Sequence, residues 1–258
     1  MDSRWNNMTI YNITDSEYEK YIQLIIRRDQ YAKEAAILEE SYIREFGEEM
    51  LHLYELKVSC IELKKKIHFC QMCVNHGKKV DTEEMQGAIA EEMKSYYKKL
   101  ANMQKTLVEV KNAKSHPHHV ILQVKRLYRE IAKMIHPDIL PQSSEDEELE
   151  SLWLRTVAAY NQNDKDELEQ VRLLVIHRLE ELGIEVDAKV DVEDIESKIE
   201  KIENEIAKII NTDPYQYKEL FDSADLLEDK HEEIEDEITQ YQKYEIELES
   251  ILDQLLGK

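Results

Sequence analysis

The sequence predicts an all-α protein built from long helices. Charged residues make up 35% of the 258 residues and apolar residues 42%, whereas the chain holds only 5 Gly and 4 Pro. Few turn-forming residues, with apolar residues recurring at steps of three and four, are typical of long helices that pack as coiled coils. We therefore expect long antiparallel coiled-coil helical hairpins that flank a shorter helical unit, and no sheet.

Residues 1–113 predict an N-terminal helical hairpin. One helix is expected over Ser16–Asn75 and a second over Thr82–Lys111. Gly77 suits the end of the first helix, and Asp81 with Glu84 resembles a capping box at the start of the second. Because the connection is short, the two helices should pair in antiparallel fashion. The expected seam residues are Leu53, Leu56, Cys60, Leu63, Ile67, Cys70 and Val74, facing Met93, Tyr96, Leu100, Met103, Leu107 and Val110.

Residues 114–163 contain a short amphipathic helix that stops at a proline. Pro137 lacks an N–H and disfavours helix at His136, so the helix should end at Ile135 and leave His136 and Asp138 on an exposed turn. A second short helix is expected over Leu149–Tyr160. The apolar side of the first helix consists of Val124, Leu127, Tyr128, Ile131, Met134 and Ile135.

Another side of the same helix is basic. The stretch from Lys125 to Lys133 holds four cations and one acid, within a chain of net charge −22. A basic stripe in so acidic a chain favours an acidic partner, because complementary potentials steer association and fix orientation. The alternative is that the stripe is only a solvated helix face.

The stretch Val124–Asp138 resembles the second helix and His-Pro-Asp (HPD) loop of J-domain proteins, the co-chaperones of DnaK-type heat-shock ATPases. Trp153, Ala159 and Tyr160 resemble the family's third helix. The resemblance covers about 45 of the 258 residues. It implies a helical unit whose basic face docks on the chaperone's ATPase domain, while the HPD turn promotes ATP hydrolysis. The chaperone-binding residues that it implies are Lys125, Arg126, Arg129, Lys133, His136, Pro137 and Asp138.

The chain also departs from the family's pattern. No Tyr-x-x-Leu first helix lies immediately upstream, where Ser115–His119 stands, and the loop Ile139–Glu150 is acidic where a basic flank is usual. A Gly/Phe-rich segment and the CxxCxGxG zinc repeats are absent from the sequence. We expect a specialised co-chaperone with coiled-coil arms for a client or partner. The alternative is a structural or adaptor protein whose J-like unit no longer engages a chaperone.

The rest of the chain predicts one bracing helix and a second hairpin. Residues 164–183 should form an amphipathic helix that ends at Gly183. Residues 184–258 should form an acidic C-terminal coiled-coil hairpin, from helices over Val192–Asn211 and Pro214–Leu256. We expect the overhanging Tyr21–Phe46 segment of the first long helix to pack on the last helix or on another subunit. Because residues 191–258 hold 22 acids and 7 Lys, nucleic-acid binding through this arm is disfavoured.

Several other classes of site are disfavoured by the sequence. Cys70-x-x-Cys73-x-x-His76 offers zinc-ligand types, but Cys60 and Cys70 fall on the hydrophobic seam, where free Cys is a small apolar residue. No phosphate loop, nucleophile elbow or HExxH motif occurs, so we expect no enzyme, cofactor or metal. The absence of a long apolar run predicts no membrane span and a cytoplasmic location. The client and any homo-oligomer are left open.

Overall fold

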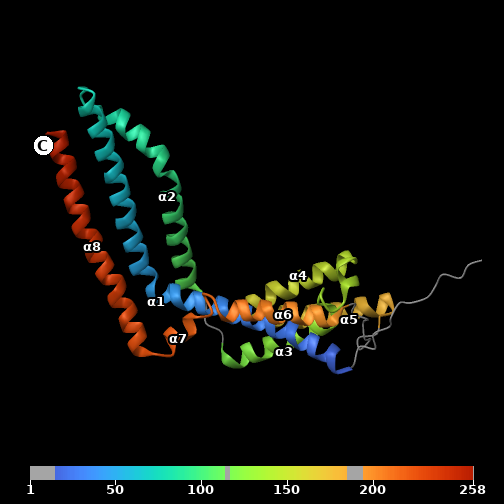
Figure 1. The fold of residues 1–258 in the computed structure, drawn as a ribbon. Coiled ribbons are helices and arrows are strands. Elements are labelled where there is room, and N and C mark those ends of the chain that lie inside the picture. The colour runs from blue at the N-terminus through green and yellow to red at the C-terminus, as the bar shows by residue number, and fades with distance from the viewer. Residues whose placement is uncertain (1–14, 114–116, 185–193, 258) are drawn as a thin grey trace, which may run out of the picture. The chain divides into compact units, whose positions relative to one another are not determined.

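The computed structural model describes residues 15–113, 117–184 and 194–257, and Figure 1 shows its fold. In these ranges the chain forms α-helices, one 3₁₀ turn and no strand, which confirms the all-α prediction. No helix in them is long and apolar enough to cross a membrane. The elements are α1 (Asp15–Asn75), α2 (Thr82–Asn112), α3 (His118–Ile135), η1 (Pro141–Ser144), α4 (Glu147–Asn161), α5 (Lys165–Leu182), α6 (Ile195–Ile210), α7 (Tyr217–Phe221) and α8 (Ala224–Leu256).

Local sequence signals fix several helix ends. The Asp81 carboxylate accepts hydrogen bonds from the N–H groups of Glu83 and Glu84 and so caps α2. Asp164 caps α5 in the same way, and Gly183 ends that helix in the left-handed region at φ 66°. These caps confirm the predicted boundaries of both helices.

The predicted Pro214–Leu256 helix is wrong in its first part. The chain instead forms the short helix α7, breaks, and begins α8 at Ala224. The Ser223 side chain accepts a hydrogen bond from the N–H of Leu226 and so caps the start of α8. The prediction had one continuous helix through this position. A serine inside an apolar repeat is the signal for this break.

The chain divides into two compact units that do not follow the order of the sequence. Residues 1–36 and 114–215 form one unit, here called the HPD unit, and residues 37–113 and 216–258 form the other, here called the arm unit. Helix α1 contributes to both. This division differs from the predicted segments 1–113, 114–163, 164–183 and 184–258.

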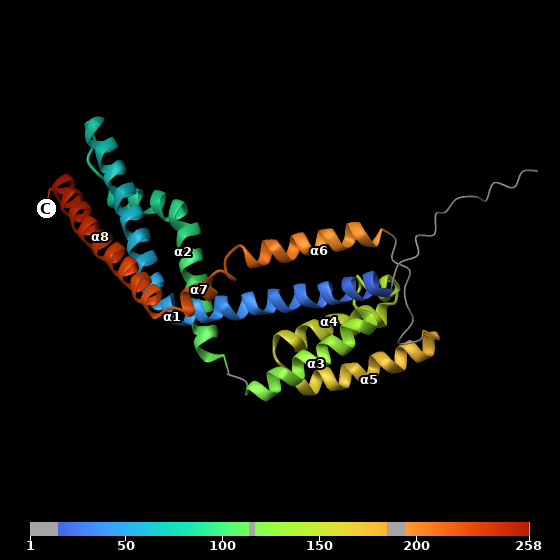
Figure 2. The same cartoon turned by 60° about the horizontal axis from the view of Figure 1, so that its bottom comes forward.

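In the arm unit, α1 lies between α2 and α8 (Figures 1 and 2). One apolar cluster joins Val58 and Cys70 of α1 to Met85 of α2, and a second joins Cys60 of α1 to Leu248 of α8. The antiparallel α1–α2 hairpin is therefore as predicted. Because α1 packs on two sides, it is apolar on two sides there.

The predicted C-terminal hairpin between α6 and α8 is wrong. Ile195, Ile199 and Ile202 of α6 are buried in the core of the HPD unit, together with residues of α1. In contrast, Ile234 of α8 packs with Phe46 of α1 in the arm unit. A row of isoleucines on one helix face indicates that the helix packs against a partner, but it does not identify that partner. In this structure α6 and α8 both pack against α1.

The core of the HPD unit is built around α5. Leu168, Val171, Val175 and Leu179 of α5 are buried in one cluster with residues of α1, α3, α4 and α6. Helix α5 packs on both α3 and α4. It therefore belongs to the core of this unit.

Alanine substitutions at two glycines of the arm unit test the packing of α1 against α2. A methyl group on Gly47 of α1 would lie 2.7 Å from Cδ1 of the buried Leu107, whereas one on Gly87 of α2 would meet nothing within 4 Å. Gly87→Ala should raise the free energy of unfolding by about 0.5–1 kcal/mol through helix propensity. Gly47→Ala should stabilise the protein less than Gly87→Ala, because the terminal methyl group of Leu107 has to move to make room and this cost offsets part of the same gain. Chemical denaturation measures both, and equal stabilisation by the two changes would contradict the packing.

Candidate functional site

The basic face of α3 lies on the surface of the HPD unit. Arg126, Arg129 and Lys133 are exposed and Lys125 is half-buried, while the opposite side of the helix is buried in the core. The Arg126 side chain is 72% exposed, and Lys133 lies 3.7 Å from Glu19 of α1. Exposed ion pairs of this kind hold side chains only weakly. Arg126, Arg129 and Lys133 are therefore accessible to a partner, and Lys125 is partly accessible.

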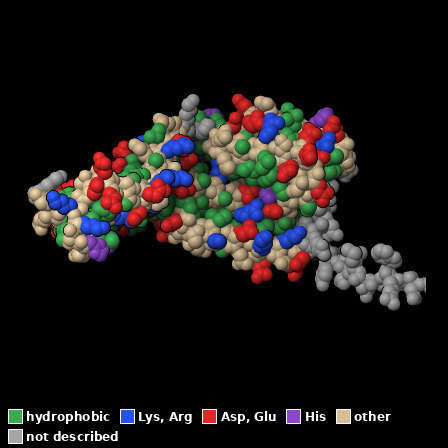
Figure 3. Space-filling view, turned by 90° about the horizontal axis from the view of Figure 1, so that it is seen from above, with side chains coloured by type: hydrophobic (Ala, Val, Ile, Leu, Met, Phe, Trp, Pro, Cys, Tyr) green, Lys and Arg blue, Asp and Glu red, His purple; other side chains and the backbone are tan. Residues whose placement is uncertain are grey.

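Charge is mixed on the face of the molecule that Figure 3 shows. In the space-filling view of Figure 3, Lys and Arg side chains lie scattered among Asp and Glu side chains. The exposed side of α3 departs from this mixing, because the stretch 125–133 holds four cations and one acid. It concentrates positive potential beside the HPD turn.

Helix α3 ends where predicted, and the chain then turns back into the core. The N–H of His136 donates to the carbonyl oxygen of Ala132 at 3.0 Å, and the His136 carbonyl accepts from the N–H groups of Ile139 and Leu140, both at 2.8 Å. The side chains of Ile139 and Leu140 are buried. The turn around Pro137 is therefore tight and anchored at both ends.

His136 is buried, so the prediction that it lies on an exposed turn is wrong. Only 5% of the residue is exposed, and its ring packs edge-on against Trp153 of α4, with ring centroids 4.6 Å apart. Its Nδ1 accepts from the N–H of Asp138 at 3.0 Å, which places the proton of the neutral imidazole on Nε2. That nitrogen lies 3.4 Å from Oδ2 of Asp29. The prediction failed because Asp29 belongs to α1, far upstream in the sequence.

Asp29 is the carboxylate at the centre of this network, with a side chain only 18% exposed. Tyr128 donates its hydroxyl to Oδ2 at 2.6 Å, and Arg28 donates from Nε and Nη2 to Oδ1 at 3.1 and 3.0 Å. Burial alone raises the pKa of Asp29, but the hydrogen bonds from His136 and Tyr128, together with the positive charge of Arg28, outweigh it and lower that pKa. Burial and the Asp29 charge raise the pKa of Tyr128, so the phenol stays a donor.

Arg28 links this network to the HPD carboxylate and to α6. Its Nη1 lies 3.1 Å from Oδ2 of Asp138 and 3.2 Å from Oε2 of Glu205. The hydroxyl of Tyr21 donates to the backbone carbonyl of Asp138 at 3.1 Å, and burial raises the pKa of Tyr21 to about 12. The Asp138 side chain is still 43% exposed. Helix α1 thus holds the turn in place while solvent reaches part of its carboxylate.

These α1 residues are the part of the site that the sequence did not reveal. Tyr21 donates to the HPD turn, and Leu24 packs against the same core. Tyr21 and Asp138 are 117 positions apart in the sequence, and the α1–α2 hairpin of the arm unit lies between them in sequence. The signal is an apolar pattern that enters the same core as α3 and α4: Tyr21, Ile22, Ile25 and Ile26.

The acidic loop after the HPD turn supplies the residue that caps the start of α4. Asp146 accepts a hydrogen bond from the N–H of Leu149 at 3.0 Å and caps the helix. Arg178 of α5 lies 2.6 Å from Asp146, and its hydrogen bond lowers the pKa of that carboxyl. Three glutamates follow in the first turn of α4, where acids are favoured by the helix dipole. These contacts account for acids where the family's pattern has a basic flank.

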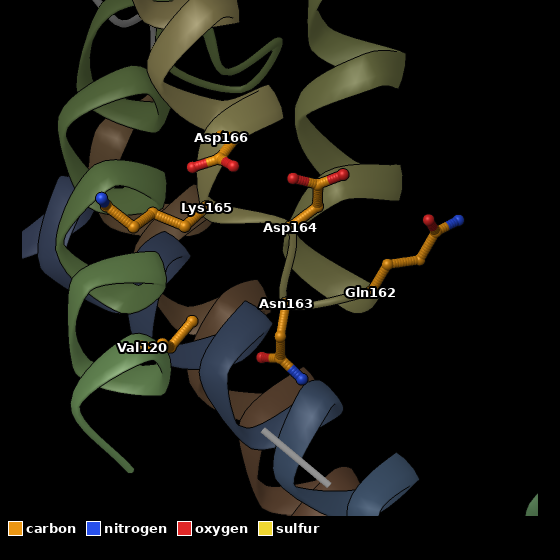
Figure 4. A pocket seen from close by; sticks show the side chains of 6 residues that line it. All are labelled: Val120, Gln162, Asn163, Asp164, Lys165 and Asp166. Carbon is orange, nitrogen blue, oxygen red and sulfur yellow. The ribbon is translucent and has the colours of Figure 1, made fainter. Parts of the chain in front are cut away.

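A shallow pocket lies at the turn between α4 and α5 (Figure 4). Asn163 points from this turn toward α1, where Lys33 donates to its Oδ1 at 2.7 Å and to the carbonyl oxygen of Tyr160 at 2.5 Å. Burial and the charge of Lys125 lower the pKa of Lys33 to about 8. These polar contacts tie α1 to the α4–α5 turn. The pocket is lined by Val120, Gln162, Asn163, Asp164, Lys165 and Asp166.

Among the residues that the structure describes, cysteine and histidine side chains are not gathered into a metal site. In the described part of the chain, no group of three His, Cys, Asp or Glu side chains could hold a metal ion. Cys60 and Cys70 are buried in separate apolar clusters of the arm unit, and Cys73 is half-buried. Burial raises the pKa of Cys60 and of Cys70, which favours the uncharged thiol.

Comparison with known proteins gives no match to a family model, a curated protein or a solved structure. The interpretation of the site therefore rests on its geometry. That geometry offers an exposed basic helix face and a partly exposed carboxylate beside it, which are groups suited to recognising another protein.

Replacing Lys33 with Met tests whether its burial makes stability depend on pH. The pKa of Lys33 in the folded protein is about 8, below the ordinary value of 10.5. Between these values the unfolded chain binds more protons than the folded chain, so the lysine's contribution to stability rises with pH. The difference in unfolding free energy, wild type minus Lys33→Met, should therefore increase between about pH 7.5 and about pH 10.

Urea denaturation at each pH measures this difference, and the exposed Lys20, replaced by Met, is the control. The difference between wild type and Lys20→Met should show no comparable rise. A difference for Lys33→Met that is flat or falls with pH would contradict the burial of the ammonium group.

Proposed function

We propose that this chain is a J-domain-like co-chaperone that recruits a DnaK-type heat-shock chaperone and stimulates its ATP hydrolysis. The observation that carries the proposal is the exposed basic face of α3, which leads into the proline-stopped turn that bears Asp138. The ATP chemistry belongs to the partner, and this chain contributes recognition. The exposed stripe fits an acidic surface, because opposite potentials accelerate encounter and set orientation.

The residues of the unit divide into two roles in this proposal. Lys125, Arg126, Arg129 and Lys133 make the electrostatic contact, and Pro137 with Asp138 presents the trigger. His136 acts as a positioning residue, because its Nδ1 accepts from the N–H of Asp138 and its ring is packed on Trp153. Substitution of His136 would then act through the geometry of the turn.

The Tyr21–Ile26 segment supports the proposal, because it packs in one core with α3 and α4. It provides a helix in the place of the first helix that the family's pattern leads one to expect. In our proposal the arm unit selects a client or a site of action, and the protein works in the cytoplasm.

One observation favours a second candidate function. His136 is buried, and Asp138 already has Arg28 as a partner. A J-like unit that only builds structure would have these features, and the protein would then be a structural or adaptor protein. The two candidates differ in whether a chaperone responds to the unit.

Single-turnover ATP hydrolysis by the host's DnaK-type chaperone tests the proposal. Wild-type protein should accelerate hydrolysis, and Asp138→Asn should not, because the amide has nearly the same shape but lacks the charge. Arg126→Glu with Lys133→Glu should weaken association, most visibly at low ionic strength, because exposed charges are screened by salt.

The matched control is Lys98→Glu with Lys105→Glu, which makes the same change of charge on exposed residues of α2. It should leave both association and hydrolysis unchanged. Hydrolysis at the unstimulated rate with wild type and with every variant would contradict the proposal and favour the adaptor function.

A further inference from the structure

One arginine is shared between the HPD turn and the C-terminal helix of the HPD unit. The guanidinium of Arg28 contacts Asp29 on its own helix, Asp138 in the turn and Glu205 on α6. Its side chain is only 21% exposed. The carboxylate that the proposed function offers to a partner is thus already paired within the chain.

Helix α6 helps to keep this pair together. Ile195, Ile199 and Ile202 are buried in the core that also holds α1. Two ion pairs join the helices, Lys20 with Glu203 at 2.8 Å and Arg28 with Glu205 at 3.2 Å. Figure 2 shows α6 running beside the N-terminal part of α1. Glu205 lies against the same Nη1 nitrogen of Arg28 as Asp138, and its negative charge helps to hold the guanidinium at this position.

We infer that α6 is an autoinhibitory element. It holds Arg28 against Asp138, so that the Asp138 carboxylate stays paired within the chain until α6 moves away from α1. This inference rests on the proposed function and concerns the regulation of the same site. A partner that binds Asp138 has to displace Arg28, so its apparent affinity falls by the fraction of molecules in the closed state. Any ligand or modification that draws α6 away from α1 would raise the activity of the unit.

Two single alanine substitutions on α6 distinguish the contact with Arg28 from the general docking of α6 on α1. Glu205→Ala removes the contact to Arg28, whereas Glu203→Ala removes the other ion pair of the same interface, which has no link to Asp138. Both glutamates are partly exposed, so the helix should stay folded, and circular dichroism checks this. Arg28→Gln removes the guanidinium itself.

The first readout is chaperone stimulation. Glu205→Ala and Arg28→Gln should each lower the concentration needed for half-maximal stimulation by about fivefold, the change expected when an ion pair of modest strength is lost. Glu203→Ala should lower it by less, because its ion pair with Lys20 joins α6 to α1 without touching Arg28.

The second readout needs no partner. Hydrogen exchange at the amides of Ile139 and Leu140, which donate to the His136 carbonyl, should be faster in Glu205→Ala and Arg28→Gln, and should change less in Glu203→Ala. Equal stimulation by all proteins with unchanged exchange would overturn the autoinhibitory role and leave the proposed function standing. Faster exchange without stimulation by any protein would instead defeat the proposed function.

Discussion

The HPD unit depends on one sheltered carboxylate. Removing a carboxylate from water is costly unless charged and hydrogen-bonding partners replace the lost hydration. Asp29 has these partners in Arg28, Tyr128 and His136. They come from α1, α3 and the HPD turn. Because the three groups must meet at one point, the carboxylate fixes how the turn is placed against α1.

The two units alternate along the sequence because α1 is shared between them. The N-terminal part of α1 belongs to the HPD unit, whereas the rest of α1 belongs to the arm unit. A single continuous helix of 61 residues therefore supplies residues to two cores. Its sequence has no single apolar stripe, because the HPD unit, α2 and α8 each require apolar residues from it. A helix that is apolar on several sides is typical of one with several packing partners.

The sequence predicted the features that depend on neighbouring residues. The cap at Asp81, the helix end at Gly183 and the proline stop at Pro137 arise from a few adjacent residues, and all three lie where the sequence placed them. Features that depend on distant contacts were missed. The isoleucines of α6 did not show that α1 is their partner, and nothing near His136 showed that Asp29 covers it. The exposed cations of α3 were predicted correctly, because an exposed helix face can be recognised without knowledge of a packing partner.

The central claim is that the imidazole of His136 is part of the fold, with Nδ1 accepting from the backbone and Nε2 facing Asp29. Nitrogen-15 NMR of the histidine rings measures the tautomer directly, and His136→Gln assigns the signal. The account predicts a neutral imidazole held in one tautomer, with the proton on Nε2. A proton on Nδ1, or the averaged signal of a ring exposed to water, would contradict it.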